Sequence, residues 1–164
     1  MMKKILLPVL ILALVIQLFV PSYMIWQRYD VLKSGTEVKF DIGLFDPYDA
    51  FRGRYVSIRV EDAIATSFVR GRYGILEIDE NGFAKISRVE SEPPKEGLYL
   101  ISSEENYFSF PHNRYYMEET LAPEAEKVIG ASAEAYITVR IKNGKSVISG
   151  MYIGDVPIEE YLTE

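Results

Sequence analysis

Residues 135–153, AYITVRIKNGKSVISGMYI, carry the clearest fold signal in the chain. Apolar and β-branched residues fill both halves of this stretch, and Asn143-Gly144 separates them. An Asn-Gly pair between two such runs favours a two-residue hairpin turn, because both central residues of that turn adopt a positive φ. The stretch therefore predicts two antiparallel strands, over Ala135–Lys142 and Ser146–Ile153.

A second hairpin is predicted upstream by the same signal. Asn81-Gly82 separates Gly74–Asp79 from Phe83–Val89, and both flanking runs are rich in apolar residues. Other segments alternate apolar and polar residues with the period of two that is typical of half-buried strands. The strands predicted outside the hairpins cover Glu37–Ile42, Tyr55–Val60 and Leu98–Ser102.

One short helix is predicted over residues 121–129, starting at Leu121 or Pro123. Thr120 is the expected N-cap, proline suits the first helical turn, and Gly130 is expected to end the helix.

A shorter helix is considered around Asp62–Phe68. The predicted fold is mainly β, barrel-like or sandwich-like, with six to eight strands and one short helix. A single N-terminal transmembrane helix is expected to precede it.

The transmembrane prediction rests on Ile5–Gln27, which contains no charged residue. As a helix this segment is about 35 Å long, enough to cross a hydrocarbon core of about 30 Å. Lysines precede it, and aromatic residues that favour the headgroup region follow its apolar part. We therefore expect a membrane anchor over residues 1–28 and an extracytoplasmic domain over residues 29–164. A cleaved signal peptide and a buried core helix are the alternatives.

Composition excludes several classes of function. The chain has no cysteine, which rules out a disulfide scaffold, a zinc-thiolate site and a cysteine nucleophile. Its formal net charge is −6, which argues against a nucleic-acid partner because phosphate binding needs a basic surface. His112 near Glu118 and Glu119 is a weak metal pattern, and a lone histidine in a polar loop more often forms a hydrogen bond. No cofactor, metal or catalytic residue is predicted.

Candidate interaction residues gather in and around the segment that leads into the Tyr55–Val60 strand. Gly53 can adopt backbone conformations closed to other residues, and Arg52 can pair with a nearby aspartate. In one interpretation the segment is a fold signature. In the other it is a recognition surface, because arginine and tyrosine are frequent at interface hot spots. The candidate set is Asp46, Pro47, Asp49, Arg52, Gly53, Arg54 and Tyr55.

This segment resembles the motif Gly-Asp-Tyr-x-x-Leu-x-Tyr of the GDYXXLXY family, uncharacterised bacterial membrane-anchored proteins. Gly53 and Tyr55 match the motif, Ile58 stands for leucine, Arg54 for aspartate and Val60 for the last tyrosine. Gly35-Thr36-Glu37-Val38 and Asp46-Pro47 also match, and the layout is similar over nearly the whole chain. The resemblance implies a single anchor helix and a multi-pass membrane protein as a partner, and it implies no established activity.

Two functions are therefore expected as alternatives. The first is a membrane-anchored, non-enzymatic accessory or interaction domain that docks on an integral membrane protein. The second is an envelope ligand-binding or hydrolytic domain that uses the Arg-Gly-x-Tyr loop and an aromatic cluster. The aromatic residues of that cluster, for which core packing is the more common explanation, are Phe108, Phe110, Tyr115 and Tyr116.

Overall fold

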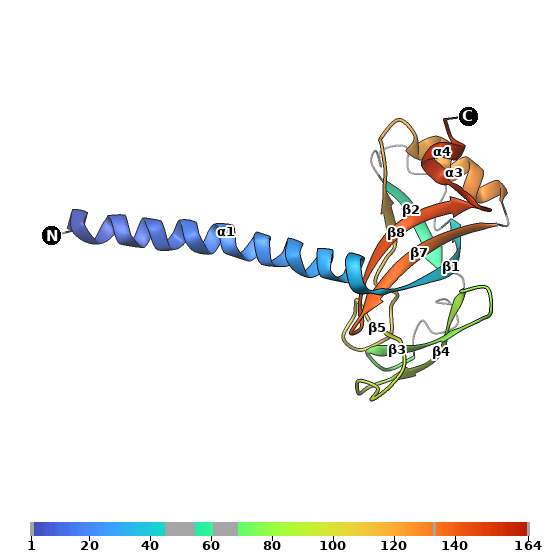
Figure 1. The fold of residues 1–164 in the computed structure, drawn as a ribbon, viewed down its shortest axis with the longest axis horizontal. Coiled ribbons are helices and arrows are strands. Elements are labelled where there is room, and N and C mark those ends of the chain that lie inside the picture. Colours follow the sequence, from blue (N-terminus) through green and yellow to red (C-terminus); the bar gives the residue numbers. More distant parts are fainter. Residues whose placement is uncertain (1, 45–54, 61–68, 133, 164) are drawn as a thin grey trace.

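The computed structural model describes residues 2–44, 55–60, 69–132 and 134–163. A long helix, α1 (Met2–Ser34), leads into a β-rich body that also carries α3 (Ala122–Ala131) and α4 (Ile158–Tyr161) (Figure 1). The strands are β1 (Thr36–Leu44), β2 (Tyr55–Val60), β3 (Tyr73–Ile78), β4 (Ala84–Glu90), β5 (Tyr99–Ile101), β6 (Arg114–Tyr116), β7 (Ala135–Lys142), β8 (Lys145–Ile153) and β9 (Val156–Pro157).

These strands form two antiparallel sheets. The larger sheet has six strands in the order β6-β2-β1-β7-β8-β9, and the smaller has three in the order β4-β3-β5. Backbone hydrogen bonds connect the two sheets. The Lys39 amide donates to the Gly82 carbonyl at 2.9 Å, and the Ile101 amide donates to the Gly144 carbonyl at 3.0 Å. The hairpin turn of each sheet thus contacts a strand of the other sheet.

Both predicted hairpins are confirmed, but their turns differ. Between β7 and β8, Asn143 and Gly144 have φ of 51° and 76°, as a two-residue turn requires. Between β3 and β4 the connection is longer, and only Gly82 has a positive φ. The Asp79 carboxylate accepts the amides of Asn81 and Phe83, each at 2.9 Å, and so organises this wider turn. The local pattern predicted the hairpin, whereas this side-chain contact sets the form of its turn.

The remaining strands follow the predicted alternation closely. β2 has the predicted bounds, β1 extends the predicted strand at both ends, and β5 is slightly shorter than expected. The described residues contain nine strands, more than the predicted six to eight, and two short helices in place of one. The short elements β6, β9 and α4 were not predicted, because two to four residues are too few to show a periodicity.

The predicted helix is present as α3, with different ends. Leu121 is its N-cap and makes no side-chain capping bond. The Thr120 hydroxyl instead donates to the Glu118 carboxylate at 3.1 Å, so the predicted cap was wrong. Gly130 does not end the helix, which continues to Ala131. The helix considered around Asp62–Phe68 lies outside the described residues.

The hydrophobic core lies against the central strands of the larger sheet. β1, β2 and β7 each place alternate apolar side chains in it, and α3 and α4 cover it with Ala125 and Ile158. Phe40 is 1% exposed and packs edge to face on Phe110, with 5.0 Å between the ring centroids. Burying a large apolar side chain contributes about 1.5–3 kcal/mol, so this strand set dominates the stability of the body. The strand residues concerned are Val38, Phe40, Ile42, Val56, Ile58, Val60, Ile137, Val139 and Ile141.

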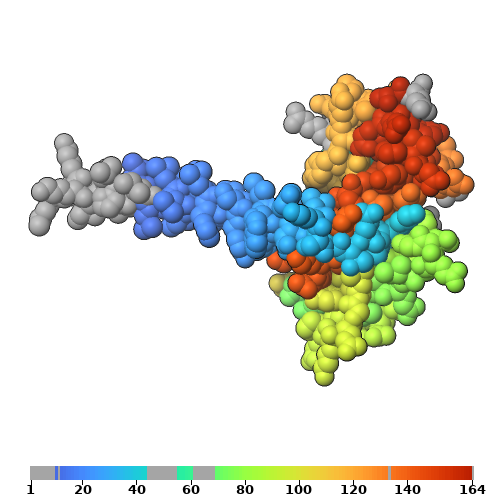
Figure 2. Space-filling view, in the orientation of Figure 1, coloured from blue at the N-terminus to red at the C-terminus, as the bar shows by residue number. Residues whose placement is uncertain are grey.

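Helix α1 projects away from the body, and its described apolar side chains are uncovered along most of its length (Figure 2). Leu18 is 69% exposed and Phe19 is 66% exposed. Only near its C-terminal end does the helix contact the strands β7 and β8. None of the helices in the described part of the chain combines the length and apolar character that a membrane crossing requires. The structure thus contains the predicted long helix. The location of this helix in a membrane stays a prediction.

Candidate functional site

Helix α1 is fixed to the body at its C-terminal end. Val31, in the last turns of the helix, is 4% exposed. The Gly35 amide donates to the Val31 carbonyl at 2.8 Å, and the chain then enters β1. A Cβ atom at Gly35 would lie 2.5 Å from the Val31 oxygen and 3.0 Å from the Ile141 nitrogen. Only glycine allows this close approach, so Gly35 permits the direct step from helix to strand.

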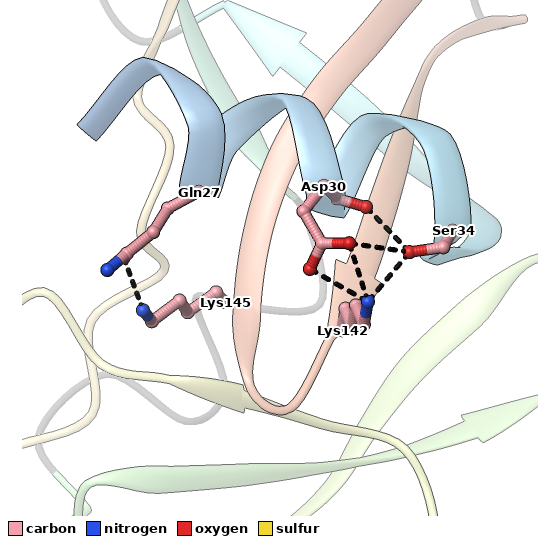
Figure 3. A network of polar contacts seen from close by, with 5 residues as sticks. All are labelled: Gln27, Asp30, Ser34, Lys142 and Lys145. Carbon is pink, nitrogen blue, oxygen red and sulfur yellow. Dashed lines mark hydrogen bonds and ion pairs between the residues drawn. The ribbon is translucent and has the colours of Figure 1, made fainter. Parts of the chain in front are cut away.

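Two lysines of the β7–β8 hairpin hold the same end of the helix through polar contacts (Figure 3). The Lys142 ammonium donates to both carboxylate oxygens of Asp30, at 2.8 and 2.7 Å, and to the Ser34 hydroxyl at 2.8 Å. This hydrogen bond lowers the pKa of Asp30. The Lys145 ammonium donates to the Gln27 side-chain oxygen at 2.6 Å. Both ends of the Asp30–Lys142 ion pair are partly exposed, so it orients the helix more than it stabilises the fold.

A cavity of about 200 Å³ lies beside these contacts. The α1 residues Met24, Gln27, Arg28 and Val31 line one side. The β8 residues Lys145, Ser146 and Val147 line the other. The lining thus combines apolar walls with two cationic side chains, and none of its described residues is acidic.

His112 contacts the hairpin side of this cavity. Its Nε2 atom lies 2.9 Å from the Ser146 hydroxyl oxygen, and its ring packs against Phe110. Burial, with a smaller contribution from the positive charge of Arg28, lowers the pKa of His112 to about 4, although hydrogen bonding to Ser146 opposes this shift. His112 is therefore an uncharged, hydrogen-bonding residue at neutral pH.

A second cluster lies on the β2–β6 pair. Tyr55 pairs with Tyr116 across the two strands, and their ring centroids are 5.9 Å apart. The Arg114 guanidinium lies 4.7 Å from the centroid of the Tyr55 ring, within the range of a cation–π contact. Tyr116 is 69% exposed, so the cluster of Tyr55, Arg114 and Tyr116 is accessible.

Tyr55 is the one predicted interaction residue that the structure describes, and its partners on β6 were not predicted. The others, Asp46, Pro47, Asp49, Arg52, Gly53 and Arg54, lie outside the described residues. Arg114 and Tyr116 are remote from Tyr55 in sequence, and only the pairing of β2 with β6 joins them.

The four aromatic residues grouped by the sequence do not share one pocket. Phe108 is buried against Gly74, where a Cβ atom would lie 2.5 Å from its ring, and Phe110 packs on Phe40. The Tyr115 hydroxyl donates to the Glu159 carboxylate at 2.6 Å, and burial together with this bond raises the pKa of Tyr115. Tyr116 belongs to the exposed cluster on β2 and β6. A ligand-binding or hydrolytic site built on all four rings would need a common cavity, and these contacts separate them.

The structure brings no metal ligands together in its described part. There, no group of three or more His, Asp and Glu side chains is placed to hold an ion. His112 bonds to Ser146, and Glu118 accepts a hydrogen bond from Thr120. Two residues of the weak metal pattern, His112 and Glu118, thus form ordinary hydrogen bonds.

The family model described as "GDYXXLXY protein" matches residues 17–151, which run from the middle of α1 to β8. The chain belongs to the GDYXXLXY family. No curated protein and no solved structure gives a significant match. Within the family motif, Ile58 and Val60 are 1% and 3% exposed and fill the core from β2. The described part of the motif is therefore strand β2, which contributes side chains to the core. Tyr55 is the first residue of this strand and lies at the surface.

Proposed function

We propose that this protein is a membrane-attached accessory domain, anchored through Ile5–Gln27 and placed to dock on an integral membrane partner. One observation carries the proposal: α1 leaves the body with apolar side chains exposed on every side. Leu14–Ile16 and Leu18–Val20 are consecutive exposed residues. Successive residues of a helix point about 100° apart, so the two triplets together with the exposed Leu10 point in directions all around the helix.

The apolar character on all sides favours lipid over a protein groove as the environment of α1. A helix that docks in a groove needs one apolar face and keeps a polar face toward water, whereas an all-round apolar helix is buried on every side. A bilayer surrounds a helix in this way. Exposed aromatic residues follow the apolar stretch, as expected for the headgroup region. They are Tyr23, Trp26 and Tyr29.

The attachment of α1 to the hairpin supports a role in positioning. A flexible tether would let the body move freely, but Val31, Gly35 and the Asp30–Lys142 ion pair fix the last turns of the helix. A body held in this way presents the same surfaces to a neighbour in the bilayer. Lys3 and Lys4 before the apolar stretch favour an N-terminus inside the cell and a body outside it.

The cluster of Tyr55, Arg114 and Tyr116 is the surface that we assign to the partner. Tyrosine and arginine are enriched at interface hot spots, because they bury large areas and still form polar contacts. Here the cation–π contact preorganises the two side-chain types on paired strands. The partner would be a multi-pass membrane protein with an acidic or carbonyl-rich extracellular face, which the guanidinium can bind.

Affinity purification of the full-length protein in gentle detergent tests the docking function. A stoichiometric membrane protein is expected with the wild type, and Arg114→Ala/Tyr116→Ala is expected to reduce its recovery at least tenfold, as loss of hot-spot residues does. The matched control is Arg88→Ala/Tyr161→Ala, which removes the same two side-chain types from exposed positions elsewhere. Mass spectrometry and circular dichroism read recovery and folding. Recovery of no membrane protein with the wild type, or equal loss with both variants, would contradict the proposal.

A further inference from the structure

The cavity between α1 and the start of β8 has the composition of a site for an anionic headgroup. Arg28 approaches from the helix and Lys145 from the hairpin, so two elements that are far apart in sequence each supply one cation. Met24, Val31 and Val147 form apolar walls around them. A cationic mouth with apolar walls fits a group that is charged at one end and apolar at the other.

The positive charge of this cavity is not neutralised by the described acidic residues. Among the residues that the structure describes, Arg28 forms no ion pair. Lys145 is held by the uncharged side chain of Gln27. Asp30, two residues after Arg28, is already bound by Lys142. The cavity therefore keeps an excess of positive charge. This charge also acts on His112, because Arg28 lowers its pKa.

The level of the cavity along α1 also fits a headgroup. Arg28 follows Trp26 by two residues, which is about 3 Å along a helix axis. Tryptophan favours the interface between headgroups and hydrocarbon, so a guanidinium at this level meets phosphate groups. Counted from Ile5, a hydrocarbon core of about 30 Å ends near Ile25, so Arg28 lies about 5 Å beyond it, within the polar layer that borders the hydrocarbon.

We propose that this cavity binds the phosphate of an anionic phospholipid, with Arg28 and Lys145 as its ligands and the apolar walls against the glycerol and upper acyl chain. This inference rests on the proposed membrane attachment, which it deepens by naming a lipid class. Juxtamembrane cations attract anionic lipids. Two cations that line one cavity can both bind the same phosphate, whereas cations scattered over the surface cannot. The lipid would then brace the angle between the helix and the body.

The test uses full-length protein in zwitterionic detergent micelles, titrated with phosphatidylglycerol. Binding is measured by isothermal titration calorimetry, because Trp26, the sole tryptophan of the chain, points about 160° away from Arg28 around the helix. Saturable binding is expected for the wild type, and about thirtyfold weaker binding for Arg28→Gln/Lys145→Gln, because each cation near a lipid surface contributes about tenfold or less. The control is Lys85→Gln/Lys95→Gln, which removes the same charge from exposed positions on the smaller sheet and its following loop.

Further measurements distinguish a lipid phosphate from free phosphate, and failure of the lipid site from failure of the proposed membrane attachment. Phosphatidylcholine is expected to bind weakly, and inorganic phosphate to compete poorly because it lacks the apolar part. Equal affinity for phosphatidylcholine, full competition by inorganic phosphate, or equal effects of the two charge variants would overturn the lipid site. Membrane fractionation of Arg28→Gln/Lys145→Gln is expected to show normal attachment. A wild type that does not attach would instead overturn the proposed function itself.

Discussion

Replacement of Leu14 and Leu18 by arginine is expected to release the full-length protein from membranes. Both side chains are exposed on α1, at 49% and 69%, so the change removes no contact with the body. An arginine at the centre of an inserted helix costs about 3 kcal/mol, and two of them shift the insertion equilibrium by a factor of 10³ or more. Fractionation with an alkaline wash, followed by flotation, measures the attached fraction.

The control for this variant adds two arginines to the body. Ser91→Arg/Ser103→Arg changes the net charge equally at exposed positions, and it is expected to stay attached like the wild type. The free energy of unfolding of the body should be unchanged in the α1 variant, because α1 is uncovered there. If Leu14→Arg/Leu18→Arg remains as firmly attached as the wild type, α1 is not the anchor.

Stability is expected to fall as the pH decreases from about 6.5 toward 4, because of His112. Its pKa is lowered from the ordinary 6.5 to about 4 by burial and by Arg28, so the unfolded chain binds a proton in this window before the folded one does. Stability rises with pH wherever the unfolded state binds more protons, and it levels off above 6.5. The ring is half-buried, so we expect a loss of about 2 kcal/mol, less than the full shift would give.

His112→Gln isolates this effect, because the glutamine amide can hydrogen-bond to Ser146 either as donor or as acceptor and does not titrate. Urea unfolding between pH 4 and 7 is expected to show a smaller slope for the variant than for the wild type. Asp30 affects stability at lower pH than His112 does. Lys142 lowers the pKa of Asp30, so the stability that this ion pair contributes is lost only as the pH falls through that lowered pKa. Parallel pH profiles for wild type and variant would show that His112 is not held uncharged by the fold.

The strands were predictable because their signals are local. The alternation in Tyr55–Val60 defined β2 from end to end, and Asn143-Gly144 marked its hairpin because the turn needs two positive φ values. The first strand was found from Val38, Phe40 and Ile42, which are all buried. In each case neighbouring residues alone carried the information.

The contacts between the end of α1 and the β7–β8 hairpin could not be predicted, because they join distant parts of the chain. Asp30 and Lys142 are 112 residues apart, and neither has a local sequence signal for the other. Gly35 was noted only within a resemblance, and its role depends on the backbone of β7 beside it. The separate contacts of the aromatic residues have the same cause: Phe108 and Phe110 are close in sequence, but their rings pack against Gly74 and Phe40 on different strands, in line with the core interpretation.

The central claim, that lipid surrounds α1, is tested most directly by the solvent accessibility of an exposed apolar residue of the helix. The chain has no cysteine, so Leu18→Cys and Ser91→Cys each give a single reactive thiol. In lipid nanodiscs, whose two sides are both open to solvent, a polar maleimide is expected to label Ser91→Cys rapidly and Leu18→Cys at least tenfold more slowly, with equal labelling after denaturation. Equal rates in the folded, nanodisc-bound protein would place Leu18 in water and contradict the account.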